Sequence, residues 1–219
     1  MTMQWLTSPG EHLLQSSPVG LRLIDDLTGQ GPIGETDCVL FIEDAPGQWR
    51  ATEVRPSRNA GGFLIFPGLG RSRDVAGKPP RRYRAEITAQ FYRPFYPNHQ
   101  TGIEFDVHPF NDDNPPAQPP SLLDVPLVPA PNYPFATHLR VLRGQVRNAA
   151  GLVVNAEVSR GNTERVLTDE RGSYALPLRL TPNNVPVAID AVDPRTAENG
   201  QITITLPADL DSNKIILIA

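Results

Sequence analysis

Proline restricts the fold of this chain more than any other residue, because it occurs 24 times in 219 residues and is spread throughout the sequence. This is about twice the usual proportion in globular proteins. Each proline removes a backbone donor and fixes its own φ, so long helices are excluded along most of the chain. One helix start is present, where Ser8, Pro9 and Glu11 form a capping box with proline at the first helical position. We therefore expect at most a short helix, within an N-terminal segment of residues 1–16.

Most of the remaining sequence alternates between apolar and polar residues, which is typical of strands with one buried face. In the segment 82–91, for example, Tyr83, Ala85 and Ile87 alternate with charged and polar residues. The pattern predicts strands near residues 19–25, 37–43, 48–54, 62–66, 82–91, 102–108 and 121–128, and a second series near 139–147, 153–159, 163–168, 172–180, 185–192, 201–206 and 213–218. Short strands separated by Gly, Pro, Asn and Asp turns indicate an all-β protein with antiparallel sheets.

Two series of seven strands predict two tandem β-sandwich domains of immunoglobulin-like architecture, over residues 17–128 and 138–219. A proline-rich linker at 129–137 separates them, because three prolines between Val128 and Phe135 do not permit a regular strand ladder. A second proline-rich segment, 109–120, is predicted to be a long surface loop of the first domain. This second segment is the alternative position for the domain boundary.

The two halves of the sequence repeat the same order of features. Each has a strand, a glycine turn, a second strand and a strand that begins with a glycine and an aromatic residue one or two positions after it. In the first half the last of these is Gly62-Phe63-Leu64, and in the second half it is Gly172-Ser173-Tyr174. The intervals between the features differ, but their order favours an internal duplication.

The second half resembles a known family of extracellular modules. The residues that carry the resemblance are Leu142-Arg143-Gly144-Gln145-Val146, Ala150-Gly151, Ala156-Glu157-Val158 and Thr168-Asp169-Glu170-Arg171-Gly172-Ser173-Tyr174. They are similar to the carboxypeptidase regulatory-like domain, and this resemblance implies a transthyretin-like sandwich of seven strands over about residues 139–219. Asp169 and Gly172 suit a tight turn, and Tyr174 is expected to be the first inward side chain of the next strand. The first half resembles a divergent copy, with Asn59-Ala60-Gly61-Gly62-Phe63 in place of the turn motif.

This resemblance implies a fold and no reaction, because such modules accompany enzymes, receptors or assemblies as interaction domains. The tandem arrangement with the Tyr133-Pro134-Phe135 linker is also similar to accessory proteins of phage-tail-like contractile injection particles. That similarity implies a role in a large protein assembly.

No residue pattern predicts catalysis, a cofactor or a metal. Cys38 is the only cysteine, which excludes an internal disulfide and a cysteine-based zinc site. The histidines are scattered, and the Tyr92, Tyr96, His99 and His108 set lacks the spacing of the iron ligands in intradiol dioxygenases. Asn111-Asp112-Asp113-Asn114 offers oxygen ligands that suit calcium, but its spacing favours a solvated turn.

A cluster of positive charge is the first candidate for binding a partner. Six basic residues occur within 14 positions of a chain whose net charge is −4, and they are Arg71, Arg73, Lys78, Arg81, Arg82 and Arg84. Such a patch attracts an acidic protein surface by long-range electrostatics. The alternative is a solvated loop and strand face. Nucleic acid is not expected as a partner, because the patch has no stacking aromatics.

The second candidate is an aromatic stretch directly after the predicted strand 82–91. Aromatic residues and arginine dominate protein interfaces, and the stretch holds Phe91, Tyr92, Arg93, Phe95 and Tyr96. Pro94 and Pro97 stiffen it, so little entropy is lost if it docks on another protein. The alternative is that Phe91 and Phe95 cap the core of the first domain.

Together these observations predict a non-enzymatic adaptor or accessory protein that binds other proteins of an assembly. No apolar run is long enough to span a membrane, and the N-terminus lacks the pattern of a signal peptide. We therefore expect synthesis in the cytoplasm, no membrane insertion, and incorporation into a particle such as a phage-tail-like device. The alternative function is a carbohydrate- or cell-surface-binding module that acts with a secreted enzyme. The sequence leaves the oligomeric state open.

Overall fold

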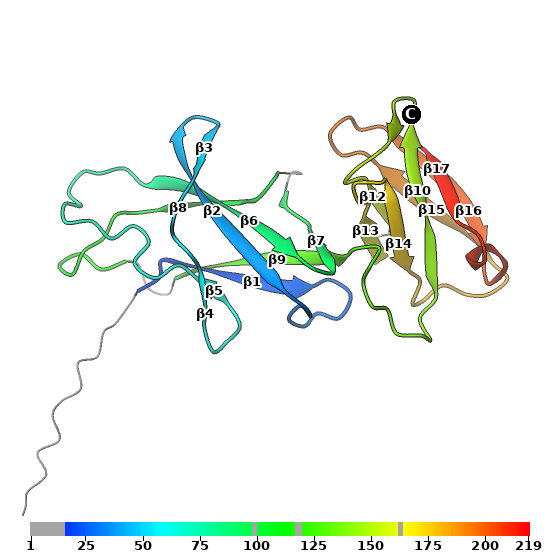
Figure 1. The fold of residues 1–219 in the computed structure, drawn as a ribbon, viewed down its shortest axis with the longest axis horizontal. Helices are drawn as coiled ribbons and strands as arrows, with labels where there is room; N and C mark the ends of the chain where they lie inside the picture. The colour runs from blue at the N-terminus through cyan, green and yellow to red at the C-terminus, as the bar shows by residue number, and fades with distance from the viewer. Residues whose placement is uncertain (1–15, 98–99, 117–119, 162–163) are drawn as a thin grey trace, which may run out of the picture.

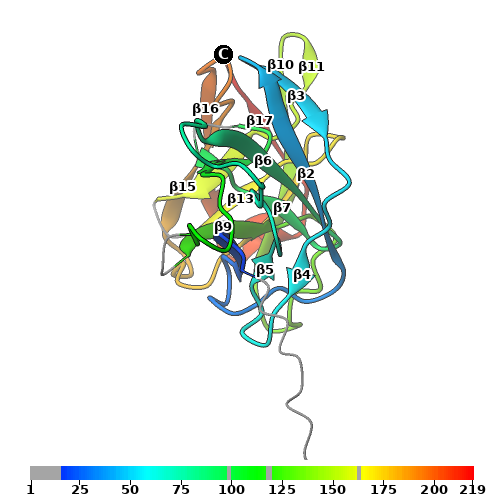
Figure 2. The same ribbon diagram turned by 90° about the vertical axis from the view of Figure 1, so that its left-hand side faces the viewer.

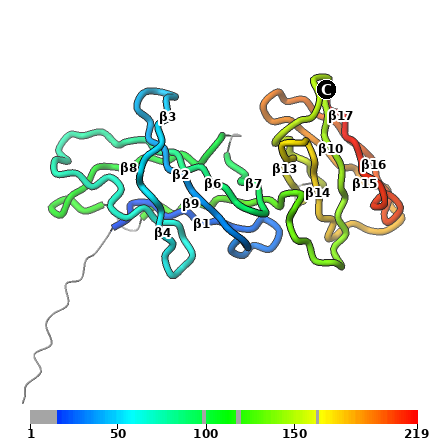
Figure 3. The backbone as a smooth tube through the Cα atoms, viewed as in Figure 1, coloured from blue at the N-terminus to red at the C-terminus, as the bar shows by residue number. Residues whose placement is uncertain are grey.

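The protein is all-β in the computed structural model, which describes residues 16–97, 100–116, 120–161 and 164–219. The described ranges contain no α-helix, and the 3-10 turn η2 (Ala208–Leu210) follows the strand β16. The expected helix near Ser8 lies outside the described residues. Figure 1 shows the strands in two groups along the long axis, which we call the first half (residues 16–129) and the second half (residues 141–219). Figure 3 traces the connecting segment, residues 130–140, from one group to the other.

The strands of the first half are β1 (Val19–Asp25), β2 (Thr36–Ala45), β3 (Gln48–Ala51), β4 (Ser57–Arg58), β5 (Leu64–Ile65), β6 (Arg81–Ala89), β7 (Tyr92–Pro94), β8 (Ile103–Val107) and β9 (Ser121–Pro129). Those of the second half are β10 (Val141–Asn148), β11 (Gly151–Leu152), β12 (Glu157–Arg160), β13 (Glu164–Leu167), β14 (Ser173–Pro177), β15 (Pro186–Val192), β16 (Asn199–Thr205) and β17 (Lys214–Leu217). Every segment that the sequence predicts as a strand overlaps one of these. The strands β4, β7 and β11 are not predicted.

The first half forms one curled sheet in the order β3-β2-β6-β7-β9-β1-β5-β4, with β8 also paired to β6. Figure 2 views the molecule from this end and shows β2 beside β6. The expected pair of separate sheets is joined here by β7, which pairs with β6 at Ala89 and with β9 between Leu127 and Pro129. This short strand is not predicted from the sequence, because Pro94 and Pro97 lie in or beside it and proline is rare within sheets.

The second half forms two four-stranded sheets. One contains β14, β10 and β17 side by side, with the short β11 also paired to β10. The other has the order β13-β12-β15-β16.

The same set of strand pairings occurs in both halves. The first strand pairs in parallel with the last strand, as β1 with β9 and β10 with β17. It also pairs antiparallel with the strand that begins at or just after the glycine and the aromatic residue, β5 or β14. Four further strands of each half follow one antiparallel order, β3-β2-β6-β8 in the first half and β13-β12-β15-β16 in the second. The short strands β4, β7 and β11 lie outside this common set. This correspondence supports the duplication that the sequence suggests.

Each half has its own hydrophobic core. In the first half the alternation of β6 places Tyr83, Ala85 and Ile87 inside, packed with residues of β1, β2 and β9. In the second half, side chains of both sheets meet around Tyr174 and Ile216. Burial of these side chains is the main force that holds each half together.

The predicted turn at Asp169 is confirmed. The Asp169 Oδ1 atom accepts hydrogen bonds of 2.8 Å from the backbone N–H groups of Arg171 and Ser173. Gly172 has a φ of +61°, which favours glycine. Tyr174 is 1% exposed and is the first inward side chain of β14.

Cys38 provides a chemical test of the first core. Its side chain is 1% exposed, and burial raises the pKa of its thiol to about 12. Because the thiolate is the reactive form, we expect a soluble disulfide reagent at mildly alkaline pH to modify the native protein at least about a hundredfold more slowly than the denatured protein. The labelling rate, followed by absorbance or mass, measures this. Equal rates in native and denatured protein would contradict the burial of Cys38.

Candidate functional site

The predicted basic patch is largely neutralised in the folded protein. Arg71 pairs with Asp112, Arg82 with Glu104, Arg84 with Glu86, and Lys78 with Asp74. The net positive charge of the patch is therefore smaller than the run of basic residues indicates, and its role in binding a partner stays a prediction. Most of the acidic partners belong to β6, β8 and the loop after β8, so the residues between 71 and 84 do not reveal them. Among the described residues, Arg73 and Arg81 form no ion pair, and they remain the part of the patch that is open to a partner.

Aromatic side chains cover one of the patch residues. The Arg84 guanidinium lies 5.2 Å from the centre of the Phe41 ring and 4.7 Å from that of Trp49. Cation–π contact of this kind holds the side chain against the sheet. Arg84 therefore has a structural role on the outer face of β2, β3 and β6.

The loop of residues 111–114 is a turn held by its own side chains. Asn111 Oδ1 accepts a hydrogen bond of 2.8 Å from the backbone N–H of Asn114, and Arg71 donates to both carboxylate oxygens of Asp112. An arginine thus occupies the most obvious cation ligand of the segment. Among the described residues, no group of three or more His, Cys, Asp and Glu side chains is placed to hold a metal ion.

The aromatic stretch packs on its own chain. Tyr92 is 3% exposed, so the prediction that its ring contacts a partner protein is wrong. Phe91 and Tyr96 pack against the first core, as the alternative interpretation expects for Phe91. The Tyr96 hydroxyl accepts a 2.7 Å hydrogen bond from the backbone N–H of Ile87, and burial raises the pKa of this phenol.

A buried carboxylate ties the aromatic stretch to the connecting segment. Asp25 is 1% exposed, and its Oδ2 atom accepts hydrogen bonds from the hydroxyls of Tyr92 at 3.2 Å and Tyr133 at 3.1 Å. The two rings meet edge to face with their centres 5.3 Å apart. Leu27 N–H and the Thr28 hydroxyl donate to the same carboxylate. Asp25 thereby fixes where the chain leaves the first half.

Arg93 and Arg165 join the two halves. Arg93, from β7, donates to Asn155 Oδ1 at 2.6 Å and to Glu170 at 2.7 Å. Arg165, from β13, donates to both carboxylate oxygens of Asp26 and lies 4.1 Å from the centre of the Phe95 ring.

A third arginine, Arg179, donates to the backbone carbonyl of Leu27 at 2.6 Å. We call Arg93, Arg165 and Arg179 together the arginine clamp. Sequence reasoning finds Arg93 alone, because Arg165 and Arg179 lie 139 and 152 residues from their partners and no local pattern marks them.

A cleft of about 570 Å³ lies beside the clamp, between the two halves. Its volume is in the range of small-molecule sites, which often occur where two domains meet. The first half contributes aromatic and amide side chains, and the second half contributes loop residues and Leu167 of β13. The lining includes Thr88, Arg93, Phe95, Tyr96, Gln100, Asn155, Glu170, Pro194 and Arg195.

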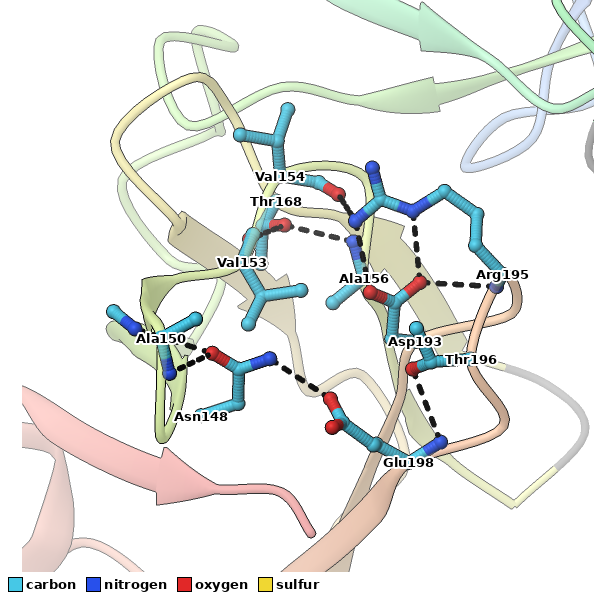
Figure 4. Close-up of polar contacts among 11 residues, drawn as sticks. Asn148, Ala150, Val153, Val154, Ala156, Thr168, Asp193, Arg195, Thr196 and Glu198 are labelled. Atoms are coloured by element: carbon cyan, nitrogen blue, oxygen red, sulfur yellow. Dashed lines mark hydrogen bonds and ion pairs between the residues drawn. The ribbon is translucent and has the colours of Figure 1, made fainter.

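Hydrogen bonds hold the second-half loops around the cleft in place. Figure 4 shows Asp193 and Arg195 facing each other, with a further bond of 2.9 Å from Arg195 to the Val154 carbonyl. In the same view Asn148 points toward Glu198, to which it donates at 2.8 Å.

The two charged pairs of the cleft, Arg93 with Glu170 and Arg195 with Asp193, leave it close to electrically neutral. The cleft therefore suits a neutral polar ligand better than a charged one.

Replacing Arg165 with alanine is expected to weaken the association of the two halves. The free energy of their contact should fall by about 1–2 kcal/mol, because the substitution removes both the ion pair with Asp26 and the stack on Phe95. Small-angle X-ray scattering should then show a larger radius of gyration, while circular dichroism stays unchanged. The matched control is Arg22→Ala, which breaks an exposed pair with Asp124 inside the first half. If Arg165→Ala gives the same scattering curve as the unaltered protein, the clamp does not set the position of the halves.

The chain has little measurable likeness to proteins of known role. Within the described ranges, no helix is long and apolar enough to cross a membrane. No family model and no curated protein matches the sequence. Among solved structures, the major pilin subunit BcpA of Bacillus cereus is similar to this chain at 11% identity and a TM-score of 0.30, over 91% of this chain and 68% of the pilin. A likeness of this size does not bear on function.

Proposed function

We propose that this protein is a non-enzymatic adaptor or accessory component of a multiprotein assembly. The observation that carries the proposal is the arginine clamp, which holds two copies of one strand arrangement in a fixed relation. A component of this kind presents surfaces at a constant distance and angle, and its own contacts supply the rigidity. The aromatic stretch and Arg93, which sequence reasoning assigns to an external partner, serve this internal purpose.

The proposed architecture is two tandem transthyretin-like sandwiches, over residues 17–128 and 138–219. Its support is the recurrence of seven strands in the same pairings, together with the Asp169 turn and the inward Tyr174 that the carboxypeptidase regulatory-like resemblance predicts. In the first half, β7 bridges the two sheets of the sandwich.

The assembly that we propose is a phage-tail-like contractile injection particle. Its support is the tandem arrangement with the Tyr133-Pro134-Phe135 connection. In the structure this connection is ordered on the first half, where Tyr133 contacts both Tyr92 and Phe135.

One observation favours a second function, the binding of carbohydrate. The cleft between the halves is close to neutral and combines aromatic rings with amide and hydroxyl groups. Neutral sugars are recognised by this combination of flat apolar surface and a few placed polar groups. Specific binding of a neutral glycan on an array, lost in Gln100→Ala, would favour this function.

The test of the adaptor proposal is purification of the tagged full-length protein from its native host, followed by mass spectrometry and electron microscopy. Recovery of sheath, tube or baseplate-like proteins together with visible particles is the expected result. A protein that elutes alone, without partners, overturns the proposal. The Arg165→Ala variant is the matched comparison, because it should reduce recovery of the particle if a fixed relation between the halves matters.

A further inference from the structure

The outer face of the β10–β17 pair carries apolar side chains in water. Ile215 and Leu217 of β17 are 51% and 70% exposed, and Leu152 of β11 is 47% exposed. Leu152 and Leu217 flank Arg147 in one row across the sheet, and Ile215 lies opposite Gln145 in the next row. In-register neighbours point to the same side of a sheet. These side chains therefore form one continuous surface, which we call the β10–β17 face.

This face also carries positive charge that no acidic residue balances. Arg143 and Arg147 of β10 are exposed, and among the described residues neither forms an ion pair. Their guanidinium groups donate to neutral acceptors, the Pro131 carbonyl and Gln145 Oε1. The three rows of the face contain no Asp or Glu, although the whole chain has a net charge of −4.

The first half provides an internal comparison, because β1 and β9 correspond to β10 and β17. There Arg22 lies opposite Asp124 in the parallel register, and the two side chains form an ion pair. In the second half, Arg147 lies opposite Leu217 instead. A parallel pair of first and last strands can therefore hold an acidic side chain beside an outward-pointing arginine. In the second half the neighbour of Arg147 is the exposed Leu217, and Arg147 has no acidic partner among the described residues.

We propose that the β10–β17 face binds an acidic, amphipathic segment of a partner protein. Apolar side chains of that segment pack on Leu152, Ile215 and Leu217, and its carboxylates pair with Arg143 and Arg147. Apolar contact combined with charge complementarity is a common basis of protein recognition. The proposal rests on the proposed adaptor function and names the surface and the chemistry of the partner.

The test uses the full chain and short fluorescein-labelled peptides in which leucine alternates with glutamate or with lysine. Fluorescence anisotropy should show saturable binding of the glutamate peptide, weaker at high salt, and much weaker binding of the lysine peptide. The double variant Arg143→Glu/Arg147→Glu should weaken binding by about tenfold or more. No saturable binding, or equal binding of both peptides, overturns the proposal.

A single substitution tests the role of the exposed leucine without disturbing the core. Leu217→Asp gives Arg147 an acidic neighbour like the one that Arg22 has in the first half. The fold should be retained, while the face loses half of its net positive charge and part of its apolar area. We expect about a tenfold loss of peptide binding. The control is Leu122→Asp on β9, which is 60% exposed and should leave binding unchanged. Equal losses in both variants would contradict the proposed location.

Failure of this proposal can be separated from failure of the adaptor function. If the unaltered protein is recovered from its host with an assembly and Leu217→Asp is recovered with the same proteins in the same amount, the adaptor function stands and the β10–β17 face is not the contact. If the unaltered protein is recovered with these assembly proteins and the Leu217→Asp variant is recovered without them, the β10–β17 face is the contact. If the unaltered protein elutes without partners, the adaptor function fails, and the peptide measurement alone decides the chemistry of the face.

Discussion

Gly144→Ala is expected to lower the free energy of unfolding of the second half by about 3 kcal/mol. A Cβ atom at this buried position would lie 1.9 Å from the Lys214 carbonyl oxygen and 2.6 Å from the Tyr174 hydroxyl. Real Cβ atoms do not approach a backbone oxygen so closely, so β17 would have to move away from β10. The pairing from Gly144 to Arg147 that closes the second half would then weaken.

Denaturant unfolding followed by circular dichroism measures this loss. Gly31→Ala is the control, because nothing lies within 4 Å of a Cβ there and no stability change is expected. Adding Tyr174→Phe to Gly144→Ala removes only the hydroxyl, so it should restore little stability if the Lys214 backbone is the main obstacle. A Gly144→Ala protein as stable as Gly31→Ala would show that this close approach is absent.

Asp25→Ala should destabilise the first half by a similar amount, about 3 kcal/mol, because it leaves the Tyr92 and Tyr133 hydroxyls without their acceptor. Asp25→Asn keeps an acceptor oxygen and should lose less. The exposed Asp124→Ala, which breaks only the pair with Arg22, should change stability by less than about 1 kcal/mol. If Asp25→Ala and Asp124→Ala unfold at the same denaturant concentration, the buried carboxylate does not hold the connecting segment.

The same cluster gives the stability a defined dependence on pH. Burial raises the pKa of the Tyr92 and Tyr133 phenols above the ordinary value of 10.0, and the nearby Asp25 carboxylate raises both further. The folded protein therefore keeps these protons where the unfolded chain releases them. This contribution to stability is complete below pH 10 and declines as the pH rises above it. The free energy of unfolding, measured at a series of alkaline pH values, should decline less steeply in the Asp25→Ala variant than in the unaltered protein.

The fold follows closely from the sequence wherever one face of a strand is buried. The alternation around Tyr83 and Ile87 reports burial directly, and the turn at Asp169 follows from local hydrogen bonding. The strand β7 is not predicted by this reasoning. Pro94 disfavours a strand, and β9, the strand that pairs with β7, lies far along the chain. Local pattern therefore predicts the elements but does not predict how β7 merges the two sheets.

The candidate site is less accessible to sequence reasoning, because charge depends on neighbours in space. The run from Arg71 to Arg84 is basic as a sequence, but partners such as Asp112 and Glu104 neutralise much of it. Conversely, Arg143 and Arg147, which form no ion pair among the described residues, do not lie in a run of basic residues that would mark them in the sequence. Their significance depends on the register that brings β17 beside β10.

The parallel pairing of the first and last strands has a consequence for the length of the molecule. Since β1 and β9 run in the same direction, the chain enters the first half at one end and leaves it at the opposite end. The same holds for β10 and β17 in the second half, and Figure 1 shows the two halves following one another along the long axis. Figure 1 also shows β1 and β9 running along the long axis and β10 running across it, so the first half carries the chain forward by its own length and the connecting segment turns it before the second half begins.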